Sequence, residues 1–308
     1  MQKRIVVVGS VNLDLVAGTQ RIPVAGETVA GSSFQTFPGG KGANQAVAAA
    51  RLGSPVSFVG RVGTDSFGTL LRTALNEAGV ETSSVSSAEG PSGVAVIATG
   101  AGGENSIIVV AGANGQVSPG YLDSQLDVIR SAGILLAQLE IPLESVEHLA
   151  RIARRESIPL MLDPAPARTL PGSLLKSVDW LTPNETETCT LLGMAREDFK
   201  ADSLDKAASA FLALGARNVI LKLGERGCYL ALADGSRKQV PACRVDAVDT
   251  TAAGDAFNGA FAAALLQGKD PVECAVWASA VAAISVTRHG AQTSMPSRAE
   301  VESFLRQR

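Results

Sequence analysis

Apolar, β-branched runs that alternate with helical segments constrain this chain more than any other feature. The runs lie at residues 4–10, 56–63, 133–140, 158–164, 178–183 and 218–225. Ala and Leu recur at three- and four-residue spacing in residues 41–52, 66–79, 142–156 and 203–215. Near-continuous apolar strands are typical of a parallel sheet buried on both faces, with helices as the crossovers. The pattern predicts a three-layer α/β/α fold with a mostly parallel central sheet and a site at the carboxyl ends of its strands.

Two segments break this alternation. Residues 15–38 are rich in Gly, Thr, Pro and Val without a helical period. Residues 92–112, SGVAVIATGAGGENSIIVVAG, indicate two strands joined by a Gly-rich turn. We expect the two segments to form a small β-sheet inserted into one domain that spans residues 1–308. A hairpin that extends the main sheet is the alternative.

The composition argues against several classes of protein. The chain has 308 residues with 46% hydrophobic content, enough for one large or two small cores. The net charge is -3 and Lys and Arg are scattered, which argues against a nucleic-acid partner. The first apolar run covers only residues 5–8 before polar residues interrupt it, too short for a signal peptide or membrane span, so we expect a cytoplasmic protein. The four cysteines form no C-x-x-C pair, which argues against a zinc site.

Three common catalytic signatures are absent from the sequence. Lys41 is followed by Gly42, so GGKGANQ is not the G-x-x-x-x-G-K-[ST] loop of Walker-type nucleotide sites. Gly9, after the first strand, does not begin a G-x-G-x-x-G fingerprint, which argues against a nicotinamide-dependent oxidoreductase. No G-x-S-x-G elbow occurs, and the chain has only two histidines, which argues against a serine hydrolase.

The segment DTTAAGDAFNGA, residues 249–260, precedes and opens a helix expected over residues 254–266. Ala252, Ala253 and Gly254 are too small to cover their own N–H groups, so a helix N-terminus is open to an anion here. Asp255 then has two interpretations. It complements the helix dipole, or it is a general base for a hydroxyl that attacks a phosphoryl group held by the amides.

Polar residues near the amino terminus bear on that choice. Asn12 and Asp14 are two apart after a strand, so on extended chain both face the same side and could hold paired sugar hydroxyls; an Asx-turn is the alternative. Gly40 permits a close approach of backbone to ligand, and Lys41 and Asn44 stand near the start of the next helix. Taken alone, Lys41 would usually be a solvated surface charge.

Later strand ends carry further polar residues. Glu140 ends an apolar strand, where it could accept from ligand hydroxyls or cap the next helix. DPAPA, residues 163–167, is a Pro-stiffened loop. Asn184 and Glu187 in TPNETE could hold hydrated Mg²⁺, with ordinary helix capping as the alternative. KLGERG, residues 222–227, is a Gly-bearing turn that could form a wall for a nucleotide base.

These motifs together resemble those of the ribokinase-like carbohydrate kinases, the PfkB family. The family's N-terminal signature is similar to GGKGANQAVAAARLG, and its C-terminal signature is similar to DTTAAGDAFNGA. GSVNLD, QLEIP, DPAPA and TPNETE follow in the expected order and spacing, so the resemblance covers essentially the whole chain. It implies transfer of the γ-phosphoryl group of ATP to the 5-hydroxyl of D-ribose, which gives ribose 5-phosphate and ADP.

The resemblance also implies the roles of individual residues. Asp255 matches the catalytic base, and the amides of Ala252, Ala253, Gly254 and Asp255 match the anion hole. The positions that match sugar contacts are Asn12, Asp14, Gly40, Lys41, Asn44, Glu140 and Asp255. The positions that match nucleotide contacts are Asn184, Lys222, Gly224, Glu225, Gly227, Gly254 and Ser279.

Two cations are implied in the same way. Asn184 and Glu187 match residues that organise Mg²⁺ through water. The positions that match the site of an activating monovalent cation, normally K⁺, are Asp249, Thr251, Ser285, Arg288, Gly290 and Ser294. Several of these would contribute only backbone carbonyls. The segments 15–38 and 92–112 match the family's β lid, which closes over the sugar and forms the usual homodimer contact.

Departures from the family pattern are few. Ser279 stands where some relatives carry His or Asn, and Asp163 begins a loop often written with Asn. Within the family, a deoxyribokinase is the nearest alternative, followed by a fructokinase or nucleoside kinase. A non-catalytic sugar-binding relative would be expected to lack the base or the anion hole, and both are present in the sequence.

Overall fold

A large twisted sheet forms the frame of the fold. The computed structural model describes residues 3–307, and within them this sheet has nine strands. In spatial order they are β13 (Arg237–Val240), β12 (Cys228–Ala231), β11 (Asn218–Lys222), β10 (Trp180–Leu181), β9 (Leu160–Leu162), β8 (Ala132–Ala137), β1 (Arg4–Val8), β4 (Val56–Gly63) and β5 (Val85–Ala88). The strands from β11 to β5 pair in parallel, and the β11–β12 and β12–β13 pairings are antiparallel, so that β12 alone among the described strands of this sheet runs in the opposite direction. The predicted mostly parallel central sheet is confirmed.

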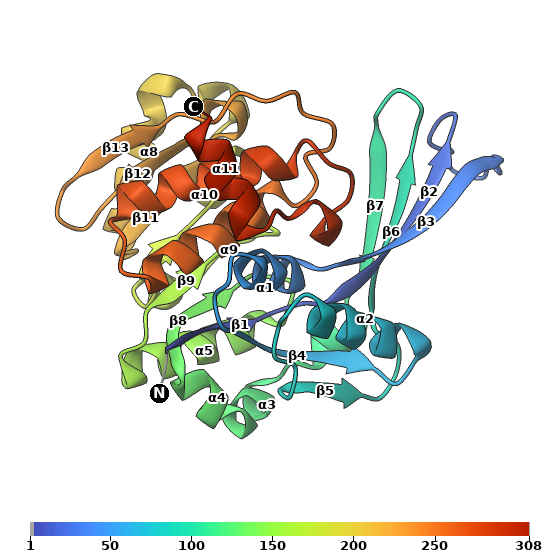
Figure 1. Cartoon of the computed structure of the whole chain (residues 1–308), viewed down its shortest axis with the longest axis horizontal. Coiled ribbons are helices and arrows are strands. Elements are labelled where there is room, and N and C mark those ends of the chain that lie inside the picture. The colour runs from blue at the N-terminus through green and yellow to red at the C-terminus, as the bar shows by residue number, and fades with distance from the viewer. Residues whose placement is uncertain (1–2, 308) are drawn as a thin grey trace.

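Helices cover both faces of this sheet (Figure 1). One face packs against α1 (Lys41–Arg51), α2 (Ser66–Glu77), α9 (Ala253–Leu266), α10 (Pro271–Ser285) and α11 (Arg298–Arg306). The other face packs against α3 (Pro119–Ser124), α4 (Leu126–Arg130), α5 (Leu143–Glu156), α6 (Gly172–Leu175), α7 (Glu185–Leu192) and α8 (Leu204–Ala213). Because side chains alternate along a strand, Ile5 and Val7 of β1 enter the first core and Val6 and Val8 the second. This is the predicted three-layer arrangement.

Short 3₁₀ turns complete the described secondary structure. They are η1 (Gly112–Gln116), η2 (Arg196–Asp198), η3 (Ala201–Ser203), η4 (Gly224–Arg226) and η5 (Gln292–Ser294). Within residues 3–307, no helix combines the length and the apolarity that crossing a bilayer requires.

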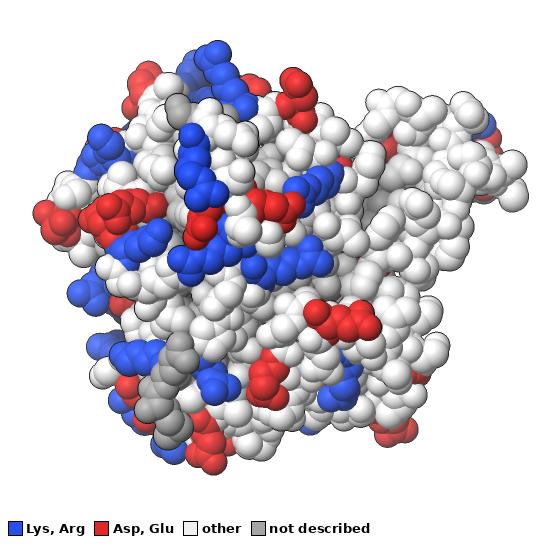
Figure 2. Space-filling model, viewed as in Figure 1, with Lys and Arg blue, Asp and Glu red and all other residues white. Residues whose placement is uncertain are grey.

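A second, smaller sheet stands apart from the large one (Figure 1). Its strands, in spatial order, are β3 (Gly31–Gly39), β2 (Asn12–Thr19), β6 (Gly93–Thr99) and β7 (Asn105–Val110). The predicted separate sheet is therefore confirmed, and the alternative of a hairpin added to the main sheet is wrong. Figure 2 shows that this sheet projects from the body and carries few charged side chains away from its tip.

The observed elements shift some predicted boundaries. The helices expected over 41–52, 142–156 and 203–215 are found within one or two residues as α1, α5 and α8. The apolar runs at 158–164 and 178–183 give much shorter strands, β9 and β10, because only three and two of their residues pair with neighbours. The predicted domain covers residues 1–308, of which 1, 2 and 308 lie outside the described residues.

Candidate active site

The first turn of α9 presents free backbone N–H groups. Ala252, the residue before the helix, has a left-handed backbone with φ of 58°. Among the described residues, no backbone carbonyl accepts from the N–H groups of Gly254 or Asp255. Free amides at the positive end of a helix dipole can bind an anion, whereas the N–H of Ala253 donates to the Thr250 carbonyl over 3.3 Å.

Asp255 is buried beside these amides, with 4% of its surface exposed. Its Oδ2 accepts a hydrogen bond of 3.1 Å from Asn44 Nδ2, and its Oδ1 accepts one of 3.1 Å from Gln45 Nε2. The pKa of Asp255 is raised to about 6, mainly by burial, while Lys41 opposes the shift. Asp163 contributes to the rise, and the two amide hydrogen bonds oppose it. A carboxylate with this pKa is ionised at neutral pH and still basic enough to take a proton from a hydroxyl.

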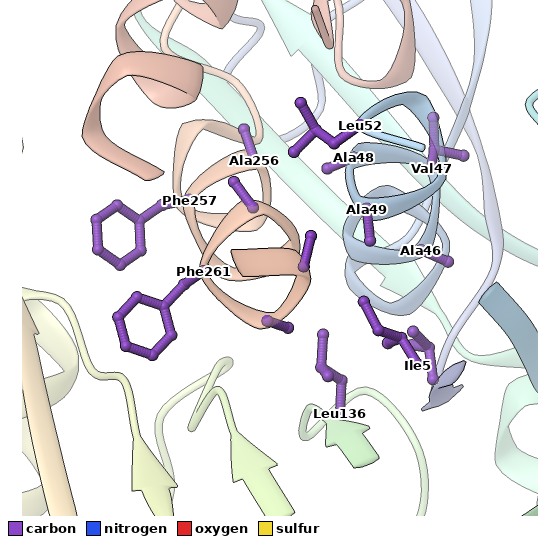
Figure 3. Close-up of a cluster of buried hydrophobic side chains, with 14 of the residues drawn as sticks. Ile5, Ala46, Val47, Ala48, Ala49, Leu52, Leu136, Ala256, Phe257 and Phe261 are labelled. Carbon is purple, nitrogen blue, oxygen red and sulfur yellow. The ribbon is translucent and has the colours of Figure 1, made fainter. Parts of the chain in front are cut away.

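Close packing of α1 against α9 brings Asn44 to Asp255. Figure 3 shows the small side chains of α1 beside α9, with Ile5 and Leu136 of the sheet below and Phe257 and Phe261 directed away from α1. At Gly259 of α9, a Cβ would lie 2.4 Å from the carbonyl oxygen of Gln45. The Ala-rich sequence therefore permits a short interhelical distance. That distance brings the side-chain amides of Asn44 and Gln45 within hydrogen-bond distance of the Asp255 carboxylate.

A chain of buried polar side chains continues from Asp255. Gln45 Nε2 also donates to Asp163 Oδ2 over 2.9 Å, and Gln138 Nε2 donates to Gln45 Oε1 over 2.7 Å. The contact from Gln138 fixes the Gln45 amide so that its nitrogen faces both carboxylates. Asp163 Oδ1 pairs with Lys222 Nζ at 2.9 Å, where the two side chains are 3% and 11% exposed.

Asn12, at the start of β2, is oriented by a residue that the sequence did not single out. Asn114 Nδ2 donates to Asn12 Oδ1 over 2.7 Å and to the Val11 carbonyl over 3.1 Å, and Asn114 Oδ1 accepts from Val11 N. Because the Asn12 oxygen already accepts this hydrogen bond, its amide nitrogen is the group left to donate to a ligand.

Asp14 lies on the same face of β2 as Asn12 and against Gly39 of the paired strand. A Cβ on Gly39 would lie 2.3 Å from Asp14 Oδ2, so a larger residue would displace the carboxylate. Burial, together with the neighbouring carboxylates of Glu140 and Asp255, raises the pKa of Asp14 to about 7. Asp14 is therefore electrostatically coupled to the predicted base.

Glu140 links the residues after β1 to the start of α1 through hydrogen bonds. Its Oε2 accepts 2.6 Å and 3.1 Å hydrogen bonds from Ser10 Oγ and the Lys41 N–H. Gly40, at φ of 91°, precedes α1, and a Cβ there would lie 2.8 Å from the backbone N of Asn12. Burial alone would lower the pKa of Lys41, but the surrounding carboxylates, Asp255 foremost, raise it. Lys41 is thus a cation held among acids and not a solvated surface charge.

Asn184 and Glu187 form a capping box at the start of α7. Glu187 Oε2 accepts 2.7 Å from Asn184 N and Oε1 accepts 2.8 Å from Asn184 Nδ2, while Glu187 N donates to Asn184 Oδ1. Both predicted interpretations, capping and cation binding, are compatible with this geometry. Burial raises the pKa of Glu187; Lys222 opposes the shift and Asp163 adds to it. The described residues contain no cluster of three His, Cys, Asp or Glu side chains suited to binding a metal directly, and this donor set fits hydrated Mg²⁺.

The predicted nucleotide residues fall at neighbouring strand ends. Asn184 pairs as a parallel β-bridge with Lys222, the last residue of β11. Gly224 and Glu225, in the turn that follows, line an open pocket of about 550 Å³ with Phe199 and Lys200. Gly227 ends the turn with φ of 85°.

Ser279 is the exception among these residues. It lies in α10, is buried, and is hydrogen-bonded through its side chain to the Cys228 thiol. The structure therefore places its hydroxyl in the core instead of at an open surface.

Asp249 joins the two loops that carry the predicted monovalent-cation residues. Its Oδ1 accepts 2.9 Å from Thr251 N, and its Oδ2 accepts 2.9 Å from Gly290 N. Burial would raise the pKa of Asp249, but these hydrogen bonds lower it overall, so the carboxylate is ionised at neutral pH. An ionised carboxylate is a chemically suitable oxygen ligand for K⁺.

The other three predicted cation residues direct their side chains elsewhere. Ser285 Oγ donates to the Ala282 carbonyl and Ser294 Oγ to the Ala291 carbonyl. Arg288 pairs with Glu300 at 2.6 Å. The resemblance implies that several of these positions would bind a cation through their backbone carbonyls, and the Ser285 carbonyl also accepts a hydrogen bond of 3.1 Å from the Arg288 N–H.

Fold and site together define a phosphotransferase: a free helix N-terminus for the phosphate, a buried carboxylate beside it for the hydroxyl, and polar strand ends for a small substrate. The family model described as pfkB family carbohydrate kinase matches residues 2–298. A ribokinase from Haemophilus influenzae is 42% identical over 306 residues, 99% of each chain. A deoxyribokinase from Salmonella typhi is 38% identical over 303 residues, 98% of each chain.

A solved structure agrees with these relatives. The structure of Arabidopsis thaliana ribokinase complexed with ribose and ATP superposes with a TM-score of 0.92 at 39% identity, over 99% of both chains. The chain belongs to the pfkB family of carbohydrate kinases.

Proposed function

We propose that this chain transfers the γ-phosphoryl group of ATP to the 5-hydroxyl of D-ribose, giving D-ribose 5-phosphate and ADP. The observation that carries the proposal is the position of the Asp255 carboxylate. It is buried, accepts two side-chain hydrogen bonds and lies next to the free backbone amides of Gly254 and Asp255. The family supplies the substrate class, and the relatives named ribokinase supply ribose as the sugar.

The chemistry assigns each part of the site a role. Asp255 takes the proton from the 5-hydroxyl as its oxygen attacks the γ-phosphorus. The bond between that phosphorus and the β,γ-bridging oxygen breaks, and its electron pair stays on ADP. The amides at the start of α9, at Ala252, Ala253, Gly254 and Asp255, stabilise the negative charge on the phosphoryl group as it moves.

The sugar is held by groups that converge on this point. Asn12 donates from its amide nitrogen, whose orientation Asn114 fixes. Asp14 and Glu140 accept from sugar hydroxyls, Lys41 and Asn44 donate, and Gly40 lets the backbone approach the ring. These assignments stand on the matched motifs and on the contacts of the side chains with one another.

ATP and two cations complete the proposed site. We propose that the nucleotide contacts the strand ends at Asn184, Lys222, Gly224, Glu225 and Gly227, and α10 at Ser279. Glu187 and Asn184 would hold Mg²⁺ through water, and the ion would neutralise phosphate charge. K⁺ would be held by the carboxylate of Asp249 and by carbonyls at Thr251, Ser285, Arg288, Gly290 and Ser294, where it would increase the positive potential near the amides.

The small sheet is proposed to act as a lid, within residues 15–38 and 92–112. Residues paired directly across strands share a face, which puts Ile107 and Val109 of β7 on the face that carries Asp14. Both are more than half exposed. Closure of this apolar face over the sugar would exclude water that could otherwise accept the phosphoryl group.

The opposite face of the small sheet is proposed to form a homodimer. It carries Phe34, Val96, Ile108 and Val110, all exposed. Contiguous apolar surface on a sheet that projects from the body favours burial against a second copy. Ile108→Lys should yield a monomer in light scattering, whereas Val109→Lys, on the inner face, should leave the dimer intact and weaken sugar binding. A dimeric Ile108→Lys protein contradicts this interface.

We also propose that the protein acts in the cytoplasm, where ATP is abundant. Activity recovered only in a membrane or secreted fraction of the source cells would contradict this location.

The function is tested by measuring ADP release with ribose, deoxyribose, fructose and adenosine, each with and without K⁺. We expect the largest kcat/KM for ribose, a rise with K⁺ and a requirement for Mg²⁺. Absence of ribose-dependent turnover by the folded protein refutes the proposal. Deoxyribose phosphorylation is the second candidate because a deoxyribokinase is 38% identical to this chain; a kcat/KM for deoxyribose above that for ribose would establish it.

A further inference from the structure

Lys222 occupies an unusual position for a charged side chain. It is the last residue of β11, and its ammonium pairs with Asp163 at 2.9 Å in a place where both side chains are almost fully buried. Desolvating two charges costs free energy that their attraction only partly offsets, so a buried pair of this kind is a weak source of stability. Stability alone therefore does not explain the buried Lys222–Asp163 pair.

The ammonium of Lys222 lies beside Gly254, in the first turn of α9. A Cβ built on Gly254 would lie 3.4 Å from Lys222 Nζ. The N–H groups of Gly254 and Asp255 are the ones that lack a carbonyl acceptor among the described residues. A full positive charge thus lies close to a residue with a free amide, and both groups can stabilise a phosphoryl group with developing negative charge.

Asp163 has a second hydrogen-bond partner, so its carboxylate would not be left unpaired if the Lys222 ammonium moved to bind a ligand. The second oxygen of Asp163 accepts from Gln45 Nε2 at 2.9 Å, and the same nitrogen donates to Asp255. When Lys222 moves toward a phosphate, the carboxylate keeps this hydrogen bond. The backbone of Lys222 is anchored as well, because its N–H donates to the Pro183 carbonyl over 2.9 Å.

We propose that Lys222 is a catalytic residue of phosphoryl transfer, whose ammonium binds the oxygens of the transferring group, and that Asp163 is a positioning residue. This rests on the proposed kinase function and goes beyond a contact with the nucleotide. As the sugar oxygen bonds to the γ-phosphorus, the bond to the β,γ-bridging oxygen breaks. Its electron pair remains on ADP, and the proton of the hydroxyl passes to Asp255. Lys222 neutralises the charge and gains or loses no atom.

The test compares single and double substitutions on the full-length protein. Lys222→Gln should lower kcat by about 100-fold, the loss typical of one donor to a developing oxyanion. Ribose affinity, measured by calorimetry without nucleotide, should stay within about 3-fold, because the sugar contacts are elsewhere. Lys222→Arg keeps the positive charge, so its kcat should be about 10-fold higher than that of Lys222→Gln.

The double variant Asp163→Asn with Lys222→Gln separates catalysis from structure. If the pair only holds the fold, replacing both charges by amides restores stability and turnover together. If Lys222 acts on the phosphoryl group, the midpoint of thermal unfolding recovers while kcat stays near that of Lys222→Gln. A double variant with near wild-type kcat overturns the proposal.

The proposed function is checked separately. Wild-type turnover is first measured with ribose, and if another sugar is the substrate, the same variants are compared on that sugar. Failure of ribose as a substrate therefore does not affect the result for Lys222.

Discussion

Asp255→Asn should gain stability relative to the wild type as the pH rises, while it abolishes most of the activity. The pKa of Asp255 is raised by burial from 3.8 to about 6, so the folded state binds a proton at this carboxyl more tightly than the unfolded chain does. The stability linked to protonation is complete below pH 3.8 and is lost as the pH rises through 6. Asparagine resembles the neutral carboxyl and suffers no such loss.

The magnitude follows from the two pKa values. A difference between 3.8 and about 6 corresponds to about 3 kcal/mol of unfolding free energy across the whole range. Roughly 2 kcal/mol of this falls between pH 4.5 and 8 by the same linkage relation. Asp255 is also one cause of the raised pKa of Asp14, so removing its charge acts in the same direction there.

The assay is urea unfolding at pH 4.5 and pH 8, followed by tryptophan fluorescence. The quantity compared is the unfolding free energy of Asp255→Asn minus that of the wild type, because any intrinsic cost of the new amide cancels between the two pH values. Asp246→Asn, at an exposed position, is the matched control and should show the same small difference at both.

Kinetics complete the test. At pH 8, Asp255→Asn should lower kcat by at least about 100-fold with ribose binding retained, since only the base is removed. The wild-type kcat/KM should fall tenfold per pH unit below about 6, as the base becomes protonated. A free-energy difference that does not change with pH, or near-normal turnover by the variant, would refute both the burial argument and the catalytic role.

Three further substitutions test the geometry. Gly259→Ala places a Cβ 2.4 Å from the Gln45 carbonyl, so it should cost about 1–3 kcal/mol by overpacking and lower kcat as α1 and α9 separate; chemical unfolding and kinetics measure both. Gly39→Ala displaces the Asp14 carboxylate and should raise the KM for ribose about 10-fold or more with the KM for ATP unchanged, since roughly 1.4 kcal/mol of binding is lost. Ala252→Gly relieves a left-handed backbone at φ of 58° and should stabilise the fold by up to about 1 kcal/mol in the same unfolding assay.

The sequence predicted the parts of this fold that depend on local pattern. The strand at 56–63 and the helix at 41–52 have long, unambiguous periods, and both match the structure closely. The runs at 158–164 and 178–183 are equally apolar but form very short strands, because strand length is set by the neighbours with which a segment pairs. Apolarity predicts burial there and does not predict pairing.

The candidate site divides in the same way. Asn44 and Asp255 stand in recognisable motifs, and the structure joins them by a hydrogen bond. Gln45, Gln138 and Asn114 were not predicted, although Gln45 is a buried polar residue within an Ala-rich helix, which is a signal that could have been used. Their roles depend on partners 93 to 210 residues away in sequence, and no local pattern encodes such contacts.

The contact between Asn44 and Asp255 spans 211 residues of chain. A ribosome therefore completes the sugar-binding side of the site long before it translates the base. A nascent chain that ends before α9 has no residue to activate the hydroxyl and no amides to receive the phosphate, so synthesis of the protein and acquisition of its activity are separated in time. Truncation anywhere before α9 should yield an inactive polypeptide, however well its first half folds.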